Sequence, residues 1–79
     1  MDRKELEAKV IELVAVAYKK DAATLSVDST FKEDLAGASV QMVALVSEIE
    51  NELEACLMLA DASACATIGD LVDLVEEEM

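Results

Sequence analysis

The chain has 79 residues, of which 54% are hydrophobic, with one Phe, one Tyr and no Trp, so residues 1–79 can form one small domain with an aliphatic core. Two glycines and no proline favour helices over a sheet with many tight turns. A net charge of −12 excludes nucleic acid and anionic membrane surfaces as partners, because both need a basic footprint on the protein.

The first predicted element is a helix over residues 3–19. Asp2 followed by Glu5 three residues later is typical of a capping box at a helix start. Four apolar residues recur at helical spacing: Leu6, Val10, Leu13 and Ala17. The charges of Lys19 and Lys20 suit the C-terminal end of this helix.

Residues 20–38 show no sustained period and are predicted to form a long loop. Loops longer than about 12–15 residues are uncommon in compact domains and are usually functional or disordered. The segment contains scattered apolar residues, namely Leu25, Val27, Phe31 and Leu35. They indicate a loop pinned to a core, with Phe31 as its anchor.

A second helix is predicted over residues 39–54. Its core face consists of Met42, Val46, Ile49 and Leu53. A neighbouring, more exposed face consists of Val40, Val43, Ala44, Ser47 and Asn51. The C-terminal half is crowded with Glu48, Glu50, Glu52 and Glu54, although a helix dipole disfavours negative charge there.

Two shorter helices complete the prediction. The third is expected near residues 59–65. The fourth is expected over residues 68–77, with Thr67 as N-cap and Asp70 three residues later. Its apolar positions are Ile68, Leu71, Val72 and Val75. The predicted fold is all-α, a small four-helix bundle with a long loop between the first two helices.

Cys56 and Cys65 lie nine residues apart in a chain without histidine. Two ligands are too few for a zinc site. A disulfide is possible in principle, but a small aliphatic domain in the cytosol more often keeps such cysteines as buried thiols.

Ser39 stands at the start of the second predicted helix, after "DLAGA". Serine is among the best N-cap residues, so a purely structural role is one interpretation. A nucleophilic serine needs a base, and the chain has no histidine; a pair with Lys32 lacks an oxyanion hole. We therefore expect that the protein is not an enzyme. The third interpretation is a modified serine, because a phosphate ester is stabilised at a helix N-terminus and no carboxylate lies between Ser39 and Ser47.

The layout of the whole chain resembles the acyl carrier proteins. The resemblance depends on "STFKEDL" in the loop, the serine that opens the second helix, "IENELEACL", and "ATIGDLVDLVEE" at the end. It implies a 4′-phosphopantetheine group joined to Ser39 through a phosphodiester, whose terminal thiol carries acyl chains as thioesters. It also implies two kinds of partner, a phosphopantetheinyl transferase and the acyl-transferring and synthase enzymes of fatty acid or related lipid or polyketide-type synthesis.

The attachment motif departs from the family pattern. Members usually have Asp-Ser-Leu, and this chain has Ala38-Ser39-Val40. Acids that often serve partner recognition are replaced by Gln41, Ala44 and Asn51, whereas Glu50 fits. The candidate partner contacts are Val40, Val43, Ala44, Ser47 and Glu50. The uncharged surroundings of Ser39 indicate either a carrier specialised for less basic partners or sequence drift.

The resemblance also implies a space between the helices that accepts the acyl chain. Candidates to line it are Met42, Val46 and Met58, although methionines more often simply fill cores. Two other functions stay open. One is a carrier for an amino acid, of D-alanyl or peptidyl type, although the Gly-Gly typical of peptidyl carriers is absent. The other is a plain helical interaction domain in which Ser39 only caps a helix.

Charge is distributed unevenly along the chain. Residues 1–20 hold four acids and five bases, whereas residues 21–79 hold 14 acids and one base. Basic protein surfaces are the natural partners of such a chain. No apolar run reaches the roughly 18 residues that cross a membrane, and the N-terminus is charged rather than signal-like. We expect a soluble, cytoplasmic monomer.

Overall fold

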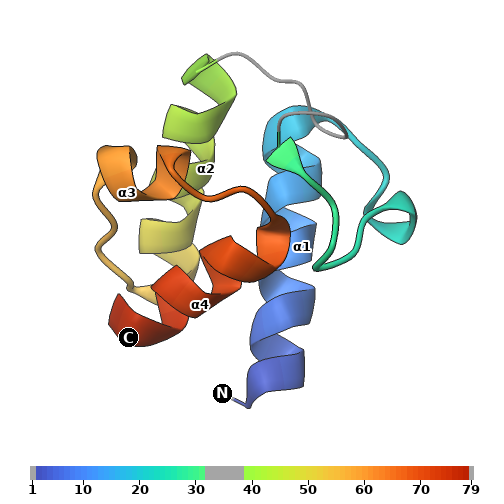
Figure 1. Ribbon diagram of the computed structural model, residues 1–79, viewed down its shortest axis with the longest axis horizontal. Coiled ribbons are helices and arrows are strands. Elements are labelled where there is room, and N and C mark those ends of the chain that lie inside the picture. Colours follow the sequence, from blue (N-terminus) through green and yellow to red (C-terminus); the bar gives the residue numbers. More distant parts are fainter. Residues whose placement is uncertain (1, 32–38, 79) are drawn as a thin grey trace.

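The computed structural model describes residues 2–31 and 39–78, with the backbone alone for Ser39 and Val40. The elements in chain order are α1 (Arg3–Tyr18), the 3-10 helix η1 (Ala22–Thr24), α2 (Ser39–Leu53), α3 (Leu59–Ser63) and α4 (Ile68–Glu78). Figure 1 shows α2 between α1 and α3, and α4 packs against both α1 and α3. The all-α, four-helix prediction with a long connection between the first two helices is confirmed.

Both ends of α1 lie within one residue of their predicted positions. At the start, the Asp2 carboxylate accepts the N–H of Glu5 at 2.9 Å, which satisfies one of the free donors of the first turn. At the end, Lys19 adopts a left-handed conformation with φ 55°, and the N–H of Lys20 donates to the Ala15 carbonyl at 2.9 Å. The left-handed Lys19 and this hydrogen bond end the helix, at a position where glycine is the more usual residue.

The core is aliphatic and draws side chains from all four helices. The predicted core face of α2 is confirmed, since Met42, Val46, Ile49 and Leu53 are all buried. Leu45, which was not included in the predicted core face, is also fully buried. The largest fully buried side chains are Leu6, Val10, Val14, Leu45, Ile49, Ile68, Leu71, Val72 and Val75. Burial of each stabilises the fold by about 1.5–3 kcal/mol relative to exposure.

Phe31 anchors the connection between α1 and α2, as predicted. Its side chain packs against the core, and its ring centroid lies 6.0 Å from that of Tyr18 in a tilted arrangement. Such aromatic pairs add about 0.5–1.5 kcal/mol to the burial itself. Leu25 also packs against the core. The predicted loop residue Leu35 lies outside the described residues.

The last described part of this connection is held by α4. The N–H of Ile68 donates to the Ser29 carbonyl at 3.0 Å, and the N–H of Gly69 donates to the Val27 carbonyl at 2.8 Å. Thr30 and Thr67 form an isolated antiparallel bridge between the same two segments. A Cβ at Gly69 would lie 3.1 Å from the Val27 carbonyl oxygen, so glycine permits this close approach.

The predicted start of α4 is confirmed in detail. The Thr67 hydroxyl accepts the N–H of Asp70 at 3.1 Å, and the Asp70 carboxylate accepts the N–H of Thr67 at 3.2 Å. This reciprocal arrangement is a capping box. The helix before it, α3, ends at Ser63 and is shorter than the predicted range 59–65.

The prediction that both cysteines are buried is wrong. Cys56 is exposed and Cys65 is half-buried, and both are free thiols. Cys56 lies in the connection between α2 and α3, where buried and exposed residues alternate from Ala55 to Met58. Ala55 and Leu57 take the inward positions, which leaves Cys56 and Met58 on the outside.

Within residues 2–31 and 39–78, no helix is both long and apolar enough to cross a membrane.

Candidate functional site

Ser39 is the first residue of α2. In Figure 1 the start of α2 and the end of α1 lie at the same end of the bundle. The first N–H groups of a helix have no partner within the helix, and the aligned peptide dipoles place partial positive charge there. The backbone at Ser39 therefore provides a local environment that stabilises an anion.

The first turn of α2 differs from those of the other three α-helices. Each of those carries a carboxylate in its first turn, namely Glu5 in α1, Asp61 in α3 and Asp70 in α4. The first turn of α2 carries none. The positive end of α2 is thus left without a carboxylate from its own helix, in a chain with 18 acids.

The candidate partner contacts on α2 face solvent where the structure describes them. Val43 is 48% exposed, and Ala44, Ser47 and Glu50 are exposed as well. The side chain of Val40 is outside the described set. The prediction of an exposed, largely uncharged face on the first half of α2 is confirmed for Val43, Ala44 and Ser47.

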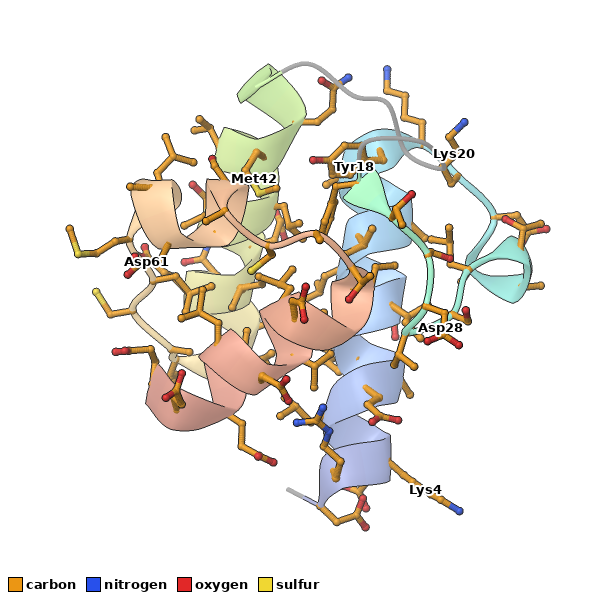
Figure 2. The ribbon with its side chains drawn as sticks, in the orientation of Figure 1. Lys4, Tyr18, Lys20, Asp28, Met42 and Asp61 are labelled. Carbon is orange, nitrogen blue, oxygen red and sulfur yellow. The ribbon has the colours of Figure 1, made fainter. Side chains whose placement is uncertain are left out.

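The candidates for an acyl-binding space are separated by the structure. Met42 and Val46 are buried on the opposite face of α2 from Ala44, and Figure 2 shows Met42 in the first half of that helix. Met58 is 70% exposed, so its predicted interior position is wrong. The alternation of the connection between α2 and α3 places Leu57, rather than Met58, in the core.

Carboxylates dominate the far end of α2. Glu50, Glu52 and Glu54 are exposed, and Glu52 lies 3.7 Å from the ammonium of Lys9 on α1. This weak ion pair identifies the flank of α2 that faces α1. Charge on α2 is therefore segregated, with none on residues 39–47 and most of it near the C-terminal end.

A groove of about 660 Å³ lies between α3 and α4. Its lining residues are Asp61, Ala64, Cys65, Asp70, Leu74, Glu77 and Glu78. Burial, followed by the fields of Asp70, Asp61 and Asp73, raises the pKa of the Cys65 thiol. A raised pKa keeps the thiol protonated and a poor nucleophile at neutral pH.

The start of α3 exposes two large apolar side chains. Leu59 is 44% exposed and follows the exposed Met58, while Ala62 fills the interior. The sequence did not predict the exposure of Leu59.

Comparison with known proteins identifies the family of this chain. Residues 8–75 match the family model described as "Phosphopantetheine attachment site". An acyl carrier protein of Exiguobacterium sp. is 28% identical over 79 residues, covering the whole of both chains. Acyl carrier proteins of Rickettsia typhi and Rickettsia prowazekii are each 36% identical over 73 residues, which cover 92% of this chain and 85% of theirs.

The matched region contains α2, α3 and most of α1 and α4. The family model spans well over half of the chain, and relatives above 30% identity cover nearly all of it. The chain therefore belongs to the acyl carrier protein family, whose members are carriers rather than enzymes and hold 4′-phosphopantetheine covalently.

Proposed function

We propose that the hydroxyl of Ser39 is the attachment point of the 4′-phosphopantetheine arm, joined through a phosphodiester. The arm's terminal thiol then carries acyl intermediates as thioesters in fatty acid or related lipid or polyketide-type synthesis. The observation that carries this proposal is the position of Ser39 as the first residue of α2.

Electrostatics at the start of α2 favour this assignment. A phosphodiester attached there lies next to the free N–H groups and the positive end of the helix dipole, an interaction worth about 0.3–1 kcal/mol at an exposed site. The first turn of α2 carries no carboxylate that would compete for these N–H groups, whereas the other three α-helices each have one there.

We assign acyl-chain binding to the buried face of α2 and partner contact to its exposed face. We assign Met42 and Val46 to the interior where an acyl chain enters, because both are buried on the core side of the helix that starts at Ser39. We assign the exposed face, with Val40, Val43, Ala44, Ser47 and Glu50, to contact with the transferase and with acyl-transferring enzymes. Residues 1–79 act as one carrier domain, which we expect to be a monomer in the cytoplasm.

Intact-mass measurement tests the attachment site. Incubation with coenzyme A and a broad-specificity phosphopantetheinyl transferase should add about 340 Da, the mass of one attached arm. Ser39→Ala should abolish the gain, whereas Ser26→Ala, which removes an exposed hydroxyl outside the assigned contact face, should leave it unchanged. A gain that persists in Ser39→Ala, or no gain in the wild type, refutes the proposal.

A further inference from the structure

One polar atom of α2 is buried without a partner. The side-chain oxygen of Gln41, Oε1, is shielded from solvent and accepts no hydrogen bond. Among the residues that the structure describes, no other buried side-chain nitrogen or oxygen is left in this state. A buried acceptor without a donor destabilises a fold, and native proteins keep very few of them. This oxygen therefore marks a place where a donor from outside the chain is expected.

Helix geometry places Gln41 on the side of α2 that faces α1. Glu52 identifies this side, since its carboxylate lies 3.7 Å from the ammonium of Lys9 on α1. Gln41 precedes Glu52 by eleven residues, which is about three turns, so the two side chains leave the helix in nearly the same direction. Gln41 therefore lies toward the end of α1, at the end of the bundle where α2 begins (Figure 1).

The Gln41 oxygen borders the aliphatic interior. Leu45, one turn further along the same side of α2, is fully buried, and Met42 is buried as well. Figure 2 shows Met42 of α2 and Tyr18 of α1 at the same end of the bundle, and both belong to the core. Because solvent does not reach the oxygen, its donor must belong to a group that enters the interior.

A trapped water is a poor source of that donor. Buried waters typically make about three hydrogen bonds to polar groups that would otherwise be unpaired. In the described part of the chain, Gln41 Oε1 is the one side-chain atom that offers such a bond. A water beside it would lose most of the hydrogen bonds that it makes in bulk solvent.

The acyl cargo is the group that the proposed function brings into this interior. A carboxamide oxygen accepts hydrogen bonds and donates none, and a saturated acyl chain has no donor to offer it. An ammonium group would bring an unpaired charge into aliphatic surroundings, which is strongly unfavourable. A hydroxyl group is neutral and supplies one donor, so it is the group that fits.

We propose that Gln41 Oε1 accepts a hydrogen bond from a hydroxyl group of the acyl chain, so that the protein holds hydroxylated chains more firmly than saturated ones. The hydroxyl belongs near the thioester, because Gln41 is two residues from Ser39, at the end of α2 from which the arm carries the cargo inward. The inference rests on the proposed function and names a substrate class for the same site.

Protection of the thioester provides the test. Wild type, Gln41→Met and Asn51→Leu are loaded by a broad-specificity transferase from octanoyl-coenzyme A or 3-hydroxyoctanoyl-coenzyme A, and intact mass reports the loading. Hydroxylamine then cleaves the thioester, and a chain held in the interior is cleaved more slowly. Methionine has the length of glutamine without its amide oxygen. Asn51 provides the control, because it is the second of the two carboxamides in the sequence and is exposed on the same helix.

The ratio of the two cleavage rates is compared between proteins, which cancels the intrinsic difference in reactivity of the two thioesters. Gln41→Met should raise the rate for the hydroxylated chain, relative to the saturated chain, by about fivefold, the factor expected for one hydrogen bond between neutral groups. Asn51→Leu should leave the ratio unchanged. The same ratio in wild type and Gln41→Met overturns the inference.

The Tm of the apo protein supplies a readout that needs no cargo. An unpaired buried oxygen destabilises the fold, so Gln41→Met should raise this Tm by a few degrees, and Asn51→Leu should not. A lower Tm in Gln41→Met would show that the oxygen already has a partner, a water included, and would also overturn the inference. A wild type that gains no mass refutes the attachment at Ser39. A wild type that loads normally but shows no effect of Gln41 refutes the selection of hydroxylated chains alone.

Discussion

The guanidinium of Arg3, in the first turn of α1, lies 2.7 Å from the carboxylate of Asp73 in α4. The same guanidinium lies 3.0 Å from Glu7 and 3.5 Å from Glu76. Hydrogen bonds to Asp73 and Glu7, and then the fields of Asp73 and Glu76, raise the pKa of Arg3. The Arg3 side chain thus links the start of α1 to α4 and offsets the repulsion between Asp73 and Glu76.

We therefore expect Arg3→Ala to lower Tm more than Lys4→Ala, which removes the adjacent positive charge. Figure 2 shows Lys4 directed away from the bundle, and its ammonium makes no ion pair with any residue in the described part of the chain. Melts of both variants at low and high salt are the measurement. Equal losses for the two variants would show that net charge matters and that the contacts of Arg3 do not.

A glycine at position 19 should stabilise the fold. Lys19 has φ 55°, a left-handed conformation that costs a residue with a side chain about 1–2 kcal/mol and that glycine adopts freely. After the greater entropy of glycine in the unfolded chain is subtracted, we expect Lys19→Gly to add about 0.5–1 kcal/mol, or a few degrees in Tm.

Lys20→Gly is the matched control for that change. It removes the same charge one residue later, where the described backbone has no positive φ, so it should lower Tm or leave it unchanged. If both variants shift Tm equally, the effect comes from charge and not from backbone conformation.

The helices were predictable because their apolar spacing and their caps agree. Asp2 with Glu5 and Thr67 with Asp70 identified two helix starts, and the structure shows the hydrogen bonds at both. Ser39 was identified as a helix start for the same reason, and α2 begins there.

Two of the errors, at Cys56 and Met58, lie in the connection between α2 and α3, where helical spacing carries no information. Cys56 and Met58 have buried residue types, but this connection leaves them exposed. Leu45 was missed although it lies three residues after Met42 and four before Ile49, a spacing that places it on the core face of α2. The exposure of Leu59 follows from the packing of α3 through Ala62.

The Cys65 thiol should react more slowly with alkylating reagents than Cys56. Burial and the nearby carboxylates, Asp70 and Asp61 foremost, raise the pKa of Cys65, so less thiolate is present at a given pH. The measurement is the rate of alkylation against pH in Cys56→Ser and in Cys65→Ser, read by intact mass.

The alkylation midpoint of Cys65 should lie above the ordinary range of a cysteine thiol, and Asp61→Asn should move it down because one repelling charge is removed. High salt should also move it down, since the groove is open to solvent. A midpoint that moves neither in Asp61→Asn nor with salt would contradict the effect of the carboxylates.

Stability should rise with salt, and further with millimolar magnesium. Residues 21–79 carry 14 acids and one base, so the compact state repels itself. The screening length falls from about 10 Å at 0.1 M salt to about 3 Å at 1 M, which weakens repulsion more than it weakens the few ion pairs. Thermal melts at low salt, high salt and low salt with magnesium decide it. A Tm that is the same in all three solutions would show that the acids are too far apart to destabilise the fold.

The last prediction concerns position 38, which lies outside the described residues but directly precedes Ser39. In this chain the Asp-Ser-Leu pattern is replaced by Ala38-Ser39-Val40. A transferase adapted to the usual pattern therefore lacks the electrostatic attraction of an acid before the serine. Ala38→Asp should therefore speed modification by such an enzyme, because complementary charge acts mainly on association rate. Ala44→Glu, on the exposed face of α2, should improve binding to basic synthase partners for the same reason.

Both gains should fade at high salt, since exposed charges are screened over about a Debye length. The fold should barely respond, because exposed substitutions usually change stability by no more than about 0.5 kcal/mol. The measurement is the initial rate of modification of wild type and Ala38→Asp at low and at high salt, with equal Tm values as the control. If the two proteins are modified equally fast at low salt, the absence of an acid at position 38 does not control recognition. The uncharged residues next to Ser39 then reflect drift rather than a carrier specialised for less basic partners.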